Sequence, residues 1–291
     1  MSVHQAAKEK KVTIQTLLDR KRNHEKITSL TAYDFPMARL VDEAGADFIL
    51  VGDSLANVVL GYETTLEVTL DDVIFCTRAV RRAVKRALVV GDMPFGSYHT
   101  SVERALDSAV RLIKEGGAEA VKLEGGQKRA YLIEKIVDNE IPVMGHIGLT
   151  PQSVNRMGGY KVQGKTLETA NQLIEDALAL EKAGVFAIVL EGVPGEIART
   201  ITERVKVPTI GIGAGVDCDG QILVISDVLG LNFGHQPRFV RQYVDLKSVI
   251  GKALETYVQD VQTGNFPGPA ETYSLPDEVA AKLKKSNVGF L

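Results

Sequence analysis

Cysteine is scarce in this chain of 291 residues, which has only Cys76 and Cys218, far apart and without a CxxC pair. This argues against a disulfide framework and against a thiolate zinc site, and it fits a reduced, cytoplasmic setting. Long apolar runs are also missing, because none approaches the roughly 18 residues of a membrane span. The first 26 residues have no apolar core and mix Glu9, Asp19 and Glu25 among the basic residues, so we expect no signal or transit peptide.

An excess of charge of one sign is lacking as well. The net charge is −3, which gives no reason to expect a nucleic-acid partner. What remains is an ordinary globular composition, 45% hydrophobic and 24% charged. A chain of this length can bury a sizeable core, as one large barrel or as two ordinary domains.

One phrase occurs three times, as EAGADFILVGD (43–53), EGGAEAVKLEG (115–125) and KAGVFAIVLEG (182–192). Each copy contains the end of a helix, a glycine suited to a helix C-cap, an apolar strand, and an acid at or near the strand tip. In an α/β barrel these tips form the rim where the chemistry takes place. Including the strand 87–91 and the acid after it, the four acids are Asp53, Asp92, Glu124 and Glu191.

Eight short apolar strands alternate with helical patterns. The expected strands are 28–33, 47–52, 87–91, 118–123, 142–147, 186–190, 208–212 and 222–226, and the expected helices include 12–22, 70–86, 101–115, 128–139, 167–183, 196–204 and 239–261. This alternation implies parallel strands, and eight units without a dinucleotide-binding GxGxxG favour a closed (β/α)₈ TIM barrel. We expect an N-terminal extension with one helix (1–26), the barrel (27–262) and a C-terminal arm (263–291), without a second domain.

Two long segments, 56–69 and 148–166, follow the second and fifth strands on the catalytic face. The glycine-rich second segment fits either a mobile flap or a long surface loop. Asp34 precedes Phe35 and Pro36, and it fits the N-cap of the next helix at least as well as it fits a catalytic acid.

The acids at the strand tips offer hard oxygen ligands without a matching cluster of histidine or cysteine. Asp53, Asp92 and Glu124 therefore suit Mg²⁺ better than Zn²⁺, although a single strand-end acid more often faces solvent or caps a helix. Lys122 lies two residues before Glu124, so both side chains point to the same side of the strand. Its ammonium either neutralises the carboxylates or binds an anionic substrate group, and the sequence favours neither.

Three further residues are candidates for the site. Glu191 follows a wholly apolar strand, where an acid can serve as a general base. His146 ends the fifth strand, and a lone histidine there more often supports a neighbour by hydrogen bonding than carries a proton. Ser54 offers a hydroxyl and an N–H group to a carboxylate, or it caps the following turn.

Longer stretches of the chain resemble a known family. They include TAYDFPMARLVDEAGADFILVGDSLANVVLGYETTLEVTLDD, CTRAVRR, GDMPFGSY, AVKLEGG, PVMGHIGLTPQSVNRMGGYKVQGK, VLEGVP, GIGAG, DVLGL and FPGPAETY. Together they resemble the ketopantoate hydroxymethyltransferase (3-methyl-2-oxobutanoate hydroxymethyltransferase) family over about residues 12–273. One departure is Ala56-Asn57, where the family commonly has Gly-Met, and a lost glycine matters if that turn needs a positive φ.

The resemblance implies a TIM barrel that uses Mg²⁺, one per subunit, and assembles as a homodecamer. The implied reaction transfers a hydroxymethyl group from 5,10-methylenetetrahydrofolate to 3-methyl-2-oxobutanoate through a Mg-stabilised enolate, giving 2-dehydropantoate for pantothenate and coenzyme A synthesis. By matching motifs, the metal ligands would be Asp53, Asp92 and Glu124, the last directly or through water, and the base that removes the C3 proton would be Glu191. The residues that bind or line the substrate would be Asp53, Ser54, Asp92, Lys122 and His146.

Two other functions compete with this one. A Mg-dependent C–C lyase of the isocitrate-lyase or phosphonomutase type would also place acids at barrel tips, but the KKCGH-like loop of that group is missing from the sequence. A catalytically silent barrel that serves in assembly would be expected to have lost some of the tip acids, and all the matched acids are present.

Overall fold

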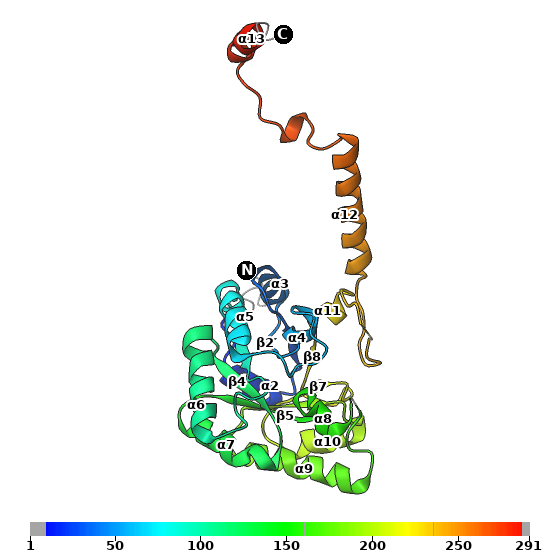
Figure 1. Ribbon diagram of the computed structural model, residues 1–291. Coiled ribbons are helices and arrows are strands. Elements are labelled where there is room, and N and C mark those ends of the chain that lie inside the picture. Colours follow the sequence, from blue (N-terminus) through cyan, green and yellow to red (C-terminus); the bar gives the residue numbers. More distant parts are fainter. Residues whose placement is uncertain (1–9, 160, 235, 287–291) are drawn as a thin grey trace. The chain divides into compact units, whose positions relative to one another are not determined.

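The computed structural model describes residues 10–159, 161–234 and 236–286. The chain divides into two compact units, Met1–Tyr243 and Val244–Leu291. All the strands that the structure describes belong to the first unit (Figure 1).

The first unit is a (β/α)₈ barrel, as the sequence predicted. Its parallel strands pair in chain order, and the last closes the barrel by pairing with the first. The strands are β1 (Ile27–Thr31), β2 (Phe48–Val51), β3 (Leu88–Asp92), β4 (Ala120–Glu124), β5 (Val143–Gly148), β6 (Ala187–Glu191), β7 (Thr209–Ile212) and β8 (Gly220–Leu223).

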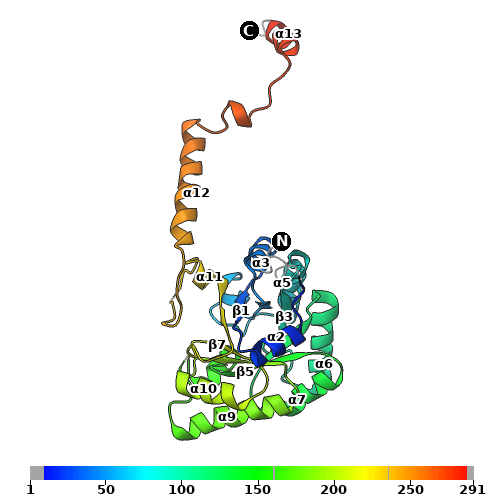
Figure 2. The ribbon, with the colours of Figure 1, turned by 180° about the vertical axis from the view of Figure 1, so that it is seen from behind.

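Helices surround these strands, and α6, α7, α9 and α10 lie outside the sheet in both views of the ribbon (Figures 1 and 2). A π-helical turn, η1 (Leu112–Gly116), continues α6, and a 3₁₀ turn, η2 (Pro151–Ser153), leads into α8. The helices of this unit are α2 (Ile14–Arg22), α3 (Phe35–Ala44), α4 (Leu55–Val58), α5 (Leu70–Ala83), α6 (Val102–Arg111), α7 (Gln127–Asp138), α8 (Val154–Met157), α9 (Leu167–Lys182), α10 (Gly195–Arg204) and α11 (Ile225–Val228).

Local capping follows the sequence signals. The Asp34 carboxylate accepts the N–H of Met37 at 2.8 Å, so Asp34 is the N-cap of α3 rather than a member of the active site. Gly45 and Gly117 end the helical segments before β2 and β4 in left-handed conformations, as the repeated phrase predicted.

Several predicted boundaries differ from those of the structure. The helix predicted over 70–86 ends at Ala83, because the Asp42 carboxylate accepts the N–H groups of Lys85, Arg86 and Ala87. The strand predicted over 222–226 ends at Leu223 and α11 follows, because the Thr31 hydroxyl accepts the N–H of Ile225.

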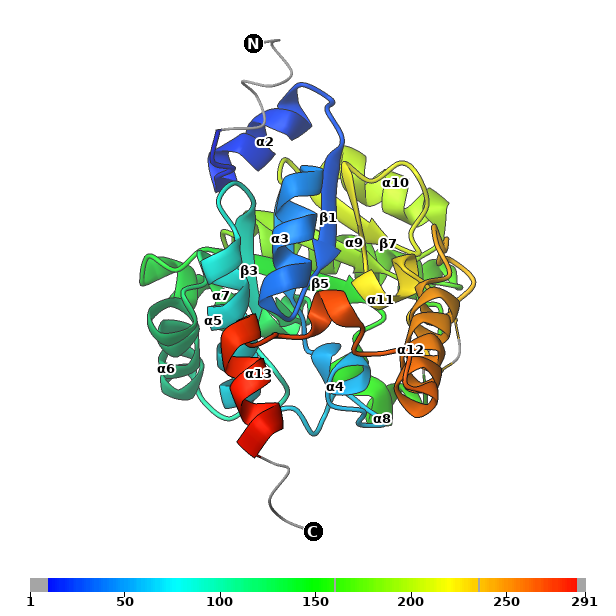
Figure 3. The same ribbon diagram turned by 90° about the horizontal axis from the view of Figure 1, so that it is seen from above.

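An apolar cluster fills the inside of the barrel. Strand residues such as Phe48, Leu50, Leu88 and Val90 belong to it. Val12 and Leu17 join the same cluster, so the N-terminal segment closes the end of the barrel where β1 begins (Figure 3). The opposite end, where the strands finish, is left for polar groups.

The described residues of the second unit, 244–286, form the helical segments α12 (Leu246–Thr263), η3 (Pro269–Glu271) and α13 (Asp277–Ser286). The helix predicted over 239–261 was wrong at its start, because Asp245 caps α12 by accepting the N–H of Ser248. In the described part of the chain, no helix combines the length and the apolar character that crossing a bilayer requires.

Candidate active site

The inward-facing register of the strands brings the predicted residues together. Side chains two positions apart point to the same face of a strand, and Val90, Ala120, Met144 and Val189 lie in the interior cluster. Two and four residues further on, the same face presents Asp92, Lys122, Glu124, His146 and Glu191. The apolar register that builds the barrel core therefore also directs these polar side chains into its carboxyl end.

Lys122 is the positive centre of the site. Its Nζ lies 2.7 Å from Asp92 Oδ2 and 3.8 Å from Glu124 Oε1. The side chains of Lys122, Asp92 and Glu124 are at most 4% exposed. Burial acts to lower the pKa of Lys122, but the neighbouring carboxylates outweigh it and raise that pKa above its usual value. Of the two roles that the sequence left open, neutralisation of the acids is the one visible in these contacts.

Burial raises the pKa of the neighbouring acids, whereas it acts to lower that of Lys122. It raises the pKa of Asp92 to about 7, although the Lys122 ammonium opposes the shift. Burial also raises the pKa of Glu124 well above its ordinary value, and the carboxylates of Asp53 and Asp92 add to this shift. An added cation would relieve the crowding of negative charge among these acids.

Asp53 and Ser54 lie just beyond the end of β2. The backbone N–H of Asp53 donates to Asp92 Oδ2 at 3.1 Å, which links the two strand ends. The Ser54 hydroxyl is 2.8 Å from the hydroxyl of Tyr33 and makes no capping hydrogen bond to α4. Ala56 lies within α4, and the non-glycine residues with positive φ in the described chain are His24 and Glu140. The loss of the family's glycine at position 56 therefore places no strain on this turn.

His146 lies between two acids. Its Nδ1 is 3.5 Å from Glu124 Oε1 and its Nε2 is 3.3 Å from Glu191 Oε2, and neither nitrogen meets the geometry of a hydrogen bond. Burial, with the positive charge of Lys122, lowers the pKa of His146. Glu191 is the more accessible acid, because its side chain is 16% exposed, whereas that of Glu124 is 2% exposed.

Two residues of this site were missed by the sequence reasoning. Gln152, in η2, donates its side-chain N–H to Asp53 Oδ2 at 3.0 Å, and its backbone N–H to Glu124 Oε2 at 3.1 Å. The Tyr98 hydroxyl donates to Gln152 Oε1 at 2.7 Å. Both side chains come from loops, whose paths have no periodic signal in the sequence.

The donor set suits a hard divalent cation. Within the described residues, Asp92 Oδ1 and Glu124 Oε1 are buried carboxylate oxygens that accept no hydrogen bond. The same residues contain no ready-made group of three or more histidine, cysteine, aspartate or glutamate side chains that could hold a metal ion. A site with few protein ligands is what Mg²⁺ prefers, because it keeps several positions for water and substrate. The oxygens of Asp92 and Glu124 that accept no hydrogen bond suit such a cation, and Asp53, Asp92 and Glu124 stay the predicted ligands.

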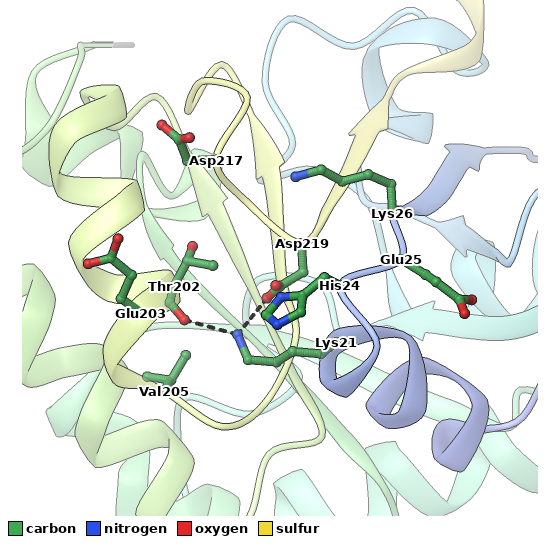
Figure 4. A pocket seen from close by; sticks show the side chains of 9 residues that line it. All are labelled: Lys21, His24, Glu25, Lys26, Thr202, Glu203, Val205, Asp217 and Asp219. Atoms are coloured by element: carbon green, nitrogen blue, oxygen red, sulfur yellow. Dashed lines mark hydrogen bonds and ion pairs between the residues drawn. The ribbon is translucent and has the colours of Figure 1, made fainter.

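A separate hollow of about 490 Å³ lies near the strand starts and includes Lys21, Thr202 and Asp219 in its lining (Figure 4). The Lys21 ammonium donates to the Thr202 carbonyl at 3.0 Å and pairs with Asp219 at 2.7 Å. These lining groups satisfy one another, and the predicted site residues are not among those that line this hollow.

Comparison with known proteins agrees with the resemblance in the sequence. The model of the family described as ketopantoate hydroxymethyltransferase matches residues 11–269. The 3-methyl-2-oxobutanoate hydroxymethyltransferase of Koribacter versatilis (strain Ellin345) is 58% identical over 274 residues, which cover 94% of this chain and 93% of the relative. That of Syntrophomonas wolfei subsp. wolfei (strain DSM 2245B / Goettingen) is 56% identical over 273 residues, or 94% of this chain and 99% of the relative.

Among solved structures, phosphonopyruvate hydrolase in complex with oxalate and Mg++ has a TM-score of 0.58. The alignment covers 94% of this chain and 96% of that one. At 12% identity, this likeness shows the fold alone. The relatives of high identity decide the family: this chain belongs to the ketopantoate hydroxymethyltransferase family and is an enzyme of that family.

Proposed function

We propose that the enzyme transfers a hydroxymethyl group from 5,10-methylenetetrahydrofolate to 3-methyl-2-oxobutanoate, giving 2-dehydropantoate. The names of the relatives support the acceptor and the transfer. The mechanism is supported mainly by the separation of the charged side chains at the rim into two groups. Lys122 and its acids form one group, and Glu191 stands apart from them beyond His146.

The first group would bind the anionic substrate. An ammonium has three N–H donors, and one N–H of Lys122 is used by Asp92. The remaining donors, with the hydroxyl of Ser54, would hold the substrate carboxylate. Mg²⁺ held by Asp53, Asp92 and Glu124 would draw charge onto the keto oxygen of the substrate and so increase the acidity of its C3 proton.

Glu191 would remove that proton. Its carboxylate contacts His146, whereas the ion pairs of Lys122 within the described chain are with Asp92 and Glu124, so Glu191 is not engaged by the ammonium. Its partial exposure gives it access to a bound molecule. The resulting enolate carbon would bond to the methylene carbon of the folate, and water would supply the hydroxyl group. Both C–N bonds of that methylene would break, and the tetrahydrofolate that leaves would take up one proton from water and the proton that Glu191 had removed.

Exchange of the C3 proton of 3-methyl-2-oxobutanoate in D₂O, followed by NMR, tests this mechanism without the folate. We expect exchange by the wild type that requires Mg²⁺ and falls at least about 100-fold in Glu191→Gln, since a positioned general base contributes roughly 10²–10⁴-fold. Glu196→Gln, on the exposed side of α10, is the matched control and should exchange at the wild-type rate. Absence of exchange by the wild type with Mg²⁺ and folate present would disprove the proposed function, and rapid exchange by Glu191→Gln would assign the base elsewhere.

A further inference from the structure

Gln152 uses all the polar groups of its side chain within the active site. Its Nε2 donates to Asp53 Oδ2 at 3.0 Å and to the Met93 carbonyl at 3.1 Å, and its Oε1 accepts the Tyr98 hydroxyl at 2.7 Å. The residue is 4% exposed. Its backbone N–H also binds Glu124, so one loop residue contacts two of the acids proposed as metal ligands.

The hydrogen bonds to two of these carboxylates use one oxygen and leave the other without a hydrogen-bond donor. Gln152 binds Oε2 of Glu124, whereas Oε1 accepts no hydrogen bond from the described residues. Asp92 shows the same division, because Lys122 and the N–H of Asp53 bind its Oδ2 and leave Oδ1 without a donor. A carboxylate held by one oxygen has a fixed orientation and keeps a lone pair for a cation.

We propose that Gln152 is a positioning residue that orients Asp53 and Glu124 for binding of a divalent cation. This inference rests on the proposed function for its purpose, but it concerns cation affinity and can be tested without catalysis. Gln152 acts through the two carboxylates and need not touch the substrate. An amide suits this position because it donates to a carboxylate without adding charge to a site that already holds several acids.

Tyr98 keeps the Gln152 side chain in place. Its hydroxyl donates to Gln152 Oε1 and accepts the backbone N–H of Glu124 at 3.2 Å. The guanidinium carbon of Arg129 lies 5.4 Å from the centre of the Tyr98 ring, and Tyr98 is 1% exposed. With its Oε1 fixed by Tyr98, the amide directs Nε2 toward Asp53, so the orientation does not depend on rotation of a free side chain.

Isothermal titration calorimetry with Mg²⁺, with and without 3-methyl-2-oxobutanoate, tests the inference on the full chain. Gln152→Met keeps the approximate length of the side chain and removes both polar atoms. We expect it to weaken Mg²⁺ binding by about 10–100-fold, which is typical for loss of a group that orients a metal ligand. The matched control is Gln163→Ala, because Gln163 belongs to the same loop but donates its side chain to the Lys161 carbonyl. Wild-type affinity in Gln152→Met within twofold, or no Mg²⁺ binding by the wild type, would overturn the inference.

A second readout separates positioning from a general loss of structure. In Gln152→Met, raising the Mg²⁺ concentration should restore C3 exchange toward the wild-type rate, whereas Glu191→Gln should stay slow at any concentration. Tyr98→Phe keeps the ring and removes the hydroxyl, and it should weaken Mg²⁺ binding in the same direction, so the inference stays testable if Gln152→Met does not fold. The two proposals can also fail separately. If the variants bind Mg²⁺ more weakly than the wild type, the role of Gln152 is supported. If the wild type binds Mg²⁺ but does not exchange the C3 proton, the proposed reaction is rejected.

Discussion

Replacing Lys122 by methionine removes the positive charge that balances the acids at the rim. The side chains of Lys122 and Asp92 are 4% and 1% exposed and lie 2.7 Å apart. Removing one partner of a buried ion pair typically costs about 3–5 kcal/mol, because the other charge stays buried without its counterion. We expect Lys122→Met to lower the free energy of unfolding by about this amount at pH 8 in metal-free protein.

The sign of the pH dependence follows from the carboxyl groups. Burial already raises the folded-state pKa of Asp92 from 3.8 to about 7, and loss of the ammonium would raise it further. A carboxyl whose folded pKa is raised binds more protons when folded, so stability falls as pH rises between the unfolded and folded values. The cost of Lys122→Met should therefore be larger at pH 8 than at pH 6.

Urea unfolding at one fixed protein concentration measures this cost. Lys135→Met is the control, because Lys135 pairs with Asp138 at 3.0 Å on the surface, where an ion pair contributes about 1 kcal/mol or less. The double variant Asp92→Asn/Lys122→Met removes both charges, so it should cost less than the sum of its single variants. A cost below about 1 kcal/mol for Lys122→Met, or strict additivity in the cycle, would refute a buried, charge-coupled pair.

Three further substitutions test two other features, the backbone at Gly148 and the titration of His99. Gly148→Ala should destabilise the fold by about 2–4 kcal/mol in urea unfolding, because φ is +96° and the added Cβ would lie 2.3 Å from the Glu191 carbonyl oxygen. Gly61→Ala, with φ +73° and open space around it, should cost only about 1 kcal/mol, and equal costs would contradict the steric argument. Burial, with the charge of Arg129, lowers the pKa of His99 from 6.5 to about 4, so its contribution to stability is present above pH 6.5 and is lost as pH falls toward 4. Because His99 is partly exposed, the wild type should lose only about 1–2 kcal/mol more than His99→Gln between pH 7 and pH 4, and parallel losses would contradict this assignment.

The sequence could predict what depends on strand periodicity. Acids placed two or four residues beyond inward-facing apolar residues had to meet at one end of a closed barrel, and Asp92, Glu124 and Glu191 do so. Helix ends were less predictable where a distant carboxylate captures backbone N–H groups, as Asp42 does after α5. Gln152 could not be found in this way, because its position depends on the path of a loop.

The position of Gln152 also limits how the segment 148–166 can move. The sequence left open whether this segment is a mobile flap or a surface loop. The turn that contains Gln152 is neither a mobile flap nor a surface loop. Hydrogen bonds to Asp53, Glu124 and Tyr98 make Gln152 part of the wall of the site. Opening the whole segment as one flap would leave buried acids without their donors, a cost of about 1–3 kcal/mol for each lost partner. Motion of this segment that does not disturb the acids must therefore leave Gln152 in place.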